Sequence, residues 1–221
     1  PLVTIFAGVG LSMLIAAPIG AAASQVGTLI MWATEQAPLV MGILVSVIVG
    51  VALTLPISSA AICAALGLTG LAGGAAVAGC CAQMVGFAVM SYKENGVGGL
   101  VSQGLGTSML QMGNIIKNPR IWIAPTLASA ITGPLATCLF HFEMNGAAVS
   151  SGMGTCGLVG QIGVYTGWVS DIAAGTKAAI TPMDWAAMVL LCFVLPAVLS
   201  VVFCEVERKL GWIKEGDLKL N

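Results

Sequence analysis

Long apolar runs, each of about the length that crosses a bilayer, most limit how this chain can fold. The clearest are Pro38–Leu55, Ile121–Phe142 and Trp185–Cys204. A helix needs about 20 consecutive apolar residues to span a bilayer. Charged residues make up only 8% of the chain, whereas a soluble domain carries about 25%. Because so few charges cannot cover a soluble surface, we predict an all-α polytopic membrane protein in contact with the lipid bilayer.

Interruptions in the apolar runs predict broken helices and re-entrant hairpins. Pro18 and Gly20 divide the first run. The segment Val97–Ile116 is too polar to face lipid, and Met144–Trp168 is too rich in glycine to form a stable lipid-exposed helix. Non-helical backbone is tolerated at membrane depth only where protein or a wet cavity surrounds it. We therefore expect both segments to enter and leave the membrane from one side, with Ser91–Gly99 as a loop before the first.

Small and polar residues inside one long apolar segment, residues 60–92, indicate helix contacts. Gly70, Gly74 and Ala78 share a helix face at i, i+4 spacing, which lets another helix approach closely. Gln83 is expected to form a hydrogen bond between helices.

The basic residues predict the orientation of the chain. Lys177 is expected outside, and all other Lys and Arg residues in the cytoplasm. This places the C-terminus in the cytoplasm and predicts a membrane domain of residues 1–204 followed by a tail of residues 205–221. Since Pro1 already lies in an apolar run, we also expect further helices before it. The cytoplasmic set is Lys93, Lys117, Arg120, Arg208, Lys209, Lys214 and Lys219.

Several classes of partner are not expected. No basic cluster is present to neutralise a nucleic-acid backbone. The seven cysteines contain no CxxC pair, which favours reduced, buried thiols over a zinc site. No catalytic triad or carboxylate pair indicates an enzyme. We predict no metal and no cofactor.

The stretch Phe140–Gln161 is the predicted substrate site. It holds the only histidine, His141, and the isolated carboxylate of Glu143, between two apolar runs. Intramembrane ionisable residues usually have a function, although a structural ion pair between these two remains the alternative. The small polar residues that follow offer donors and acceptors to a solute, or else a tightly packed helix contact. The candidate substrate-binding residues are His141, Glu143, Asn145, Ser150, Ser151, Thr155 and Gln161.

Several long motifs connect the chain to a known family. The segments GCCAQMVGFAVMSYKENG, NPRIWIAPTLASAITGPLAT, SSGMGTCGLVGQIG and RKLGWIKEGDLKL resemble the phosphotransferase-system IIC-like membrane family, in the perfringolysin-regulator-type branch. The resemblance implies a bacterial cytoplasmic-membrane permease with the IIC fold, a homodimer, and an elevator-like movement of substrate. It also implies that Glu143 binds sugar, with His141 a weaker candidate, and that separate IIA and IIB proteins perform any phosphorylation.

Three functions therefore stay open. The first is a permease that moves a small polar solute, with carbohydrate the favoured class, through a mid-membrane site. The second is a regulatory or scaffold protein that keeps this fold without transport. The third is an ion-coupled transporter in which Glu143 carries a proton.

Overall fold

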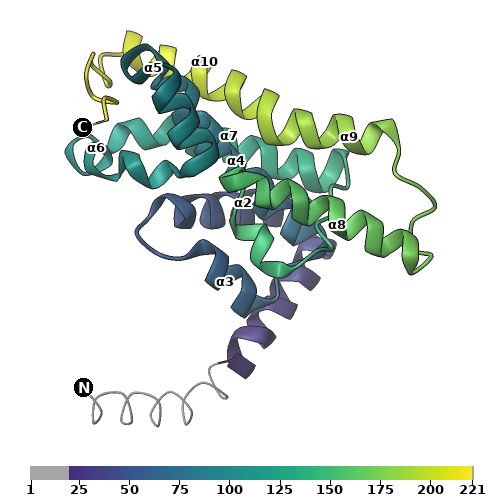
Figure 1. The fold of residues 1–221 in the computed structure, drawn as a ribbon. Coiled ribbons are helices and arrows are strands. Elements are labelled where there is room, and N and C mark those ends of the chain that lie inside the picture. The colour runs from purple at the N-terminus through teal and green to yellow at the C-terminus, as the bar shows by residue number, and fades with distance from the viewer. Residues whose placement is uncertain (1–19, 221) are drawn as a thin grey trace, which may run out of the picture.

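The computed structural model describes residues 20–220, and within them every regular element is helical (Figure 1). The predicted break at Pro18 lies outside the described residues, and residues 20–36 form one helix. The α-helices that follow are α2 (Pro38–Thr54), α3 (Ser59–Leu66), α4 (Gly70–Met90), α5 (Tyr92–Val101), α6 (Met112–Lys117), α7 (Ile123–Pro134), α8 (Val159–Ala173), α9 (Pro182–Val189) and α10 (Leu195–Lys209). Short 3-10 or π turns connect several of them: η1 (Ser102–Gly106), η2 (Ser108–Gln111), η3 (Pro119–Trp122), η4 (Leu135–Leu139), η5 (Ala148–Gly152), η6 (Cys156–Leu158) and η7 (Leu190–Val194).

Continuous helical stretches confirm the prediction of a polytopic membrane protein. Three are long and apolar enough to span a bilayer, namely Gly70–Met90, Pro119–Leu139 and Pro182–Lys209, and α2 is a shorter apolar helix. Large apolar side chains such as Ile48 of α2 and Val198 of α10 are more than half exposed. Such side chains are suited to contact with lipid rather than water.

Helix α4 is the centre of the bundle, packed between α2, α7 and α10. Its small residues allow the backbones to approach closely. A Cβ at Gly50 of α2 would lie 2.7 Å from the carbonyl oxygen of Gly79 in α4. Apart from its ends, almost every residue of α4 is therefore buried.

Gln83 links the helices around α4. Its side chain is fully buried, and its Oε1 accepts hydrogen bonds from the Trp122 indole at 3.0 Å and the Thr54 hydroxyl at 3.3 Å. Its Nε2 donates to the Thr126 and Ser129 hydroxyl oxygens of α7. The predicted interhelix role of Gln83 is confirmed. Trp122, which lies at a loop edge in the sequence, points into this network rather than acting only as an interfacial anchor.

We predict that Gln83→Leu lowers the unfolding free energy of the protein. Leucine leaves the partly buried Trp122 indole N–H and the buried Ser129 and Thr54 hydroxyls without this partner, and an unsatisfied buried polar group costs roughly 1–3 kcal/mol. Unfolding monitored by intrinsic tryptophan fluorescence would measure the change. Gln36→Leu, an exposed position near the end of the helix of residues 20–36, is the matched control. Equal stability of the two variants would contradict the account of Gln83.

Two prolines lie next to widened turns in the spanning helices. Pro134 lies inside α7, and the π turn η4 follows it directly. Pro196 cannot donate to the carbonyl of Cys192, and that carbonyl lies in the π turn η7. A proline removes one i to i−4 hydrogen bond, and π turns are a common local response to such a change.

The first hairpin, residues 92–117, confirms the predicted return of the chain to its starting side. Its first arm is α5 and η1, its tip surrounds Thr107, and its second arm is η2 and α6. Asn95 near the start and Asn114 near the end both donate to backbone carbonyls of the C-terminal tail. The two ends of the hairpin therefore lie together.

The predicted loop Ser91–Gly99 is wrong. Residues 92–95 and 97–99 are helical, and within the predicted loop the backbone departs from helix only at Ser91 and at Gly96, whose φ is 58°. Glu94 and Asn95 bind the C-terminal tail, a tertiary contact that favours helix over loop and that local sequence does not reveal.

Three other boundaries differ from expectation. Gly67, in a left-handed conformation, ends α3 and divides the long apolar segment of residues 60–92. The polar stretch Asp171–Asp184 indicates a loop in the sequence, but helix α8 continues into this stretch as far as Ala173. Helix α10 continues past Cys204 to Lys209, because its last two turns still pack on the bundle through buried Cys204 and Glu207.

The second hairpin, residues 144–173, also returns to the side on which it starts. Its short arm is η5, its tip is residues 153–158, and its long arm is α8. The arms are in backbone contact, since a Cβ at Gly167 would lie 2.8 Å from the backbone nitrogen of Asn145. The glycines of α8 allow this packing, but Ile162 and Val169 of the same helix are exposed, so the expectation that this segment forms no exposed helix is wrong for α8.

The basic residues divide between the two ends of the bundle. Lys93 pairs with Glu205 at 2.8 Å, and Arg208 with Glu94 at 2.9 Å, just beyond the C-terminal end of α4. Lys177 lies in the loop between α8 and α9 and lines the same cavity as Phe142, whose carbonyl contacts Gly74 near the start of α4. The 21 residues of α4 separate these ends by about 30 Å. The separation of Lys177 from the other basic residues agrees with the distribution expected from the sequence. Which end of the bundle faces the cytoplasm stays a prediction.

Candidate functional site

Residues 140–147 form an irregular segment that crosses the N-terminal end of α4. Gly70 and Met144 exchange two backbone hydrogen bonds of 3.0 Å, and Gly74 faces the carbonyl oxygen of Phe142 so closely that a Cβ there would overlap it. The face of Gly70, Gly74 and Ala78 therefore makes a close contact, as predicted. Its partner at Gly70 and Gly74 is this segment rather than another helix.

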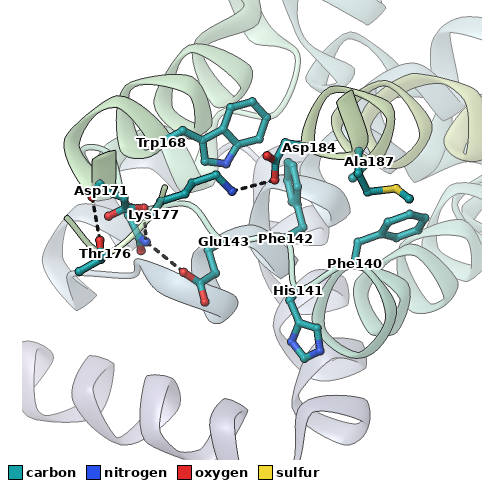
Figure 2. Close-up of a pocket in the computed structure, with 12 residues that line it drawn as sticks. Phe140, His141, Phe142, Glu143, Trp168, Asp171, Thr176, Lys177, Asp184 and Ala187 are labelled. Atoms are coloured by element: carbon teal, nitrogen blue, oxygen red, sulfur yellow. Dashed lines mark hydrogen bonds and ion pairs between the residues drawn. The ribbon is translucent and has the colours of Figure 1, made fainter. Parts of the chain in front are cut away.

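The segment alternates between buried and exposed residues. Phe142 and Met144 are buried in the apolar core, whereas His141 and Glu143 are exposed. His141 has a φ of 43°, which is uncommon outside glycine. This turn, together with the extended backbone that follows, makes the two ionisable side chains extend in the same direction (Figure 2).

The two side chains line an open cavity of about 480 Å³ between the segment, α8 and the start of α9. His141 and Glu143 thus border a cavity, as the predicted substrate site requires, and do not form the buried ion pair that was the alternative. Its lining is Phe140, His141, Phe142, Glu143, Asn145, Trp168, Asp171, Thr176, Lys177, Met183, Asp184 and Ala187.

Asn145 connects the two carboxylates on one side of the cavity. Its Nδ2 donates to Glu143 Oε2 at 3.1 Å and to Asp171 Oδ2 at 2.9 Å. One amide group therefore holds Glu143 next to Asp171, so that their remaining oxygens can accept hydrogen bonds from a solute.

An ion pair closes the other side of the cavity. Lys177 Nζ lies 2.8 Å from Asp184 Oδ1 and 5.8 Å from the centroid of the Trp168 ring. Asp184 also completes a capping box with Thr181 at the start of α9. The Lys177 cation is thus held between a carboxylate and an aromatic face (Figure 2).

Nine of the twelve lining residues were not among the predicted site residues, and four of these nine make the polar and cation–π contacts described above: Trp168, Asp171, Lys177 and Asp184. One sequence signal could have indicated them. Lys177 is the basic residue assigned alone to the opposite side, and two acids flank it, so a local charge cluster was visible. Its position beside Glu143 depends on the fold of the second hairpin, which the sequence alone does not give.

The other four predicted site residues lie apart from the cavity, inside the second hairpin. Ser151 Oγ donates to the Leu68 carbonyl at 2.7 Å, and Gln161 Nε2 donates to Cys81 Sγ at 3.2 Å. Ser150 and Thr155 are buried as well. Among the described residues Gln161 Oε1 has no hydrogen-bond partner. The structure therefore brings together His141, Glu143 and Asn145, and a solute-binding role for Ser150, Ser151, Thr155 and Gln161 stays a prediction.

The tips of the two hairpins meet in the interior of the bundle. Thr155 of the second hairpin donates to the carbonyl oxygen of Gly104 in the first. Next to this contact, Ser108 shares a 2.9 Å hydrogen bond with Thr54 at the end of α2. Non-helical backbone at membrane depth is tolerated where protein surrounds it, and the contact between the two tips provides such surroundings.

Comparison with protein families agrees with this architecture. The family model described as "Phosphotransferase system, EIIC" matches residues 1–220. The chain belongs to the phosphotransferase-system EIIC family. This confirms the family resemblance seen in the sequence motifs, whereas the perfringolysin-regulator-type branch stays a prediction. No curated protein and no solved structure matches the chain.

Membership of the EIIC family indicates the general function of the chain. EIIC is the membrane transport component of a phosphotransferase system rather than its catalytic component. The EIIC chain is therefore a multi-pass membrane protein, with IIA and IIB proteins as its candidate partners. The cavity beside Glu143 is the candidate solute site of this EIIC chain.

Proposed function

We propose that this protein is a permease that moves a small polar solute, with carbohydrate as the favoured class. The solute first binds in the cavity lined by His141, Glu143 and Asn145. The observation that carries the proposal is the Asn145 amide, which holds the Glu143 and Asp171 carboxylates beside an open cavity.

The lining chemistry supports a polyhydroxylated solute. Carboxylate oxygens accept hydrogen bonds, and sugar hydroxyls donate them. Phe140 and Phe142 add apolar surface beside these acceptors, which suits the C–H faces of a sugar ring. A strongly anionic solute is less suited, because it would approach Glu143 and Asp171 together.

The cavity lies at one end of α4 rather than at the expected mid-membrane position, so a solute bound there has not yet crossed the bundle. The meeting of the hairpin tips at Thr155 and Gly104 supports a pathway that continues between them. We further propose a homodimer in the bacterial cytoplasmic membrane, with the C-terminus in the cytoplasm. Phosphorylation would then be performed there by separate IIA and IIB proteins.

Sugar binding and transport by the purified protein test this proposal. The protein is reconstituted in proteoliposomes, and uptake of a panel of labelled hexoses, pentoses and disaccharides is measured with and without a pH gradient. We expect binding of at least one sugar, seen as a rise in thermal stability, and uptake of that sugar without a pH gradient. Uptake that needs the gradient, but not phosphoenolpyruvate, would favour an ion-coupled transporter. Neither binding nor uptake across the panel would favour a regulatory scaffold.

A further inference from the structure

The C-terminal tail, residues 212–220, folds back onto the first hairpin instead of extending away from α10. Gly211 turns the chain at the end of α10 with a φ of 71°. The apolar side chains of Ile213 and Leu218 are then buried in one core cluster with Phe87 of α4 and Ile115 of α6. Ile213 and Leu218 thus attach this charged segment to the apolar core of the bundle.

Side chains of the hairpin hold the backbone of the tail. In the first arm, Glu94 Oε2 accepts from the Leu218 N–H at 2.9 Å, and Asn95 donates to the Leu218 carbonyl at 2.8 Å. Asn95 Oδ1 also accepts from the Leu220 N–H at 2.8 Å. Paired contacts of this kind are how a groove binds an extended peptide.

The second arm of the hairpin binds the same stretch of tail. Gln111 Nε2 donates to the Leu218 carbonyl at 3.0 Å, and Asn114 Nδ2 donates to the Lys219 carbonyl at 3.0 Å. The tail therefore joins the two arms, because Leu218 is bound from both at once.

A continuous set of hydrogen bonds extends from the tail toward the hairpin tip. Gln111 Nε2 also donates to Gln103 Oε1 at 2.8 Å, and both glutamine side chains are fully buried. Gln103 is adjacent in sequence to Gly104, whose carbonyl accepts the hydrogen bond from Thr155 of the second hairpin. Buried polar networks of this kind have few alternative arrangements, since an unpaired member is costly.

We propose that residues 212–220 form a latch that fixes the first hairpin, and that release of this tail loosens the contact between the two hairpin tips. Release removes the Leu218 anchor and the bonds that join the arms, so that Gln111 and Gln103 lose their fixed arrangement. The latch rests on contacts among described residues and does not depend on the proposed transport activity.

Amide hydrogen exchange of the full chain in nanodiscs tests the latch through the variant Leu218→Asp. A carboxylate cannot occupy the apolar hole of Leu218 without a large desolvation cost. We expect exchange in residues 92–117 and 153–158 to become roughly tenfold faster or more, while the middle of α4 keeps its protection. Leu210→Asp is the matched control, because Leu210 is 57% exposed. A synthetic peptide of residues 212–220, added to Leu218→Asp, should restore protection, and the same peptide carrying Leu218→Asp should not.

Unchanged exchange at residues 153–158, in a variant whose tail exchanges freely, would overturn the proposal. If Leu218→Asp instead loses protection throughout α4, the double variant Asn95→Ala and Asn114→Ala decides, because it removes tail bonds without altering the apolar core. Faster exchange at both hairpin tips in that double variant supports the latch, and wild-type exchange there refutes it.

Discussion

Replacing Gly74 by leucine should destabilise the protein strongly and abolish solute binding together with it. A side chain at Gly74 would overlap the carbonyl oxygen of Phe142, which is backbone and cannot rotate away. The segment that carries His141 and Glu143 would have to leave α4. We expect a loss of roughly 4 kcal/mol or more in unfolding free energy, in the range that overpacking against buried backbone can produce.

The matched control is Gly113→Leu, since a Cβ at Gly113 in α6 meets no atom within 4 Å. Thermal unfolding of both variants in the same detergent gives the comparison. If Gly74→Leu were as stable as Gly113→Leu, the irregular segment could not lie against α4 as described.

Replacing Glu143 by glutamine should lower solute affinity by roughly tenfold or more, which corresponds to about 1.4 kcal/mol. Glutamine keeps the shape of the side chain but loses its charge and one acceptor, and hydrogen bonds to a charged group contribute about 1.5–3 kcal/mol. Stability should change little, because Glu143 is exposed in the open cavity and, within residues 20–220, its carboxylate accepts a hydrogen bond only from Asn145.

Titration calorimetry with the best-binding sugar, together with thermal unfolding, measures both quantities for Glu143→Gln. The matched control is Glu215→Gln, an exposed acid in the tail, which should bind like wild type. A Glu143→Gln variant with wild-type affinity and reduced stability would show that this carboxylate is structural. That result would favour a scaffold function over a permease function.

Apolar composition and periodic interruptions were enough to predict the spanning helices and both hairpins. The run Trp185–Cys204 lies within the spanning stretch Pro182–Lys209, whereas the run Pro38–Leu55 forms the shorter apolar helix α2. Glycine content similarly predicted a hairpin rather than one continuous span at Met144–Trp168. These predictions depend on local composition, and local composition is what a bilayer constrains.

Elements whose structure depends on tertiary contacts could not be predicted from local composition. The helix around Glu94 and Asn95 forms where local sequence indicates a loop, and both side chains bind residues of the distant tail. Likewise, Lys177 and Asp184 reach the cavity through the loop after α8, whose path depends on the packing of the second hairpin. A single sequence contains no information on such pairings beyond the charges themselves.

The candidate site was predicted in part for the same reason. His141, Glu143 and Asn145 are close in sequence, and an alternating extended segment brings them to one cavity. Ser151 and Thr155 carry equally suitable hydroxyls, but in the structure they bond to carbonyls of Leu68 and Gly104. Polarity alone cannot distinguish a side chain that binds solute from one that holds a hairpin in place.

The most direct measurement of the central claim is an experimental structure with the best-binding sugar of the panel present. We predict density for the sugar in the cavity, within hydrogen-bonding distance of Glu143 and beside Asn145 and Asp171. Density for the sugar between the hairpin tips at Thr155 and Gly104, with the Glu143 cavity empty, would contradict the claim that solute binds first at Glu143.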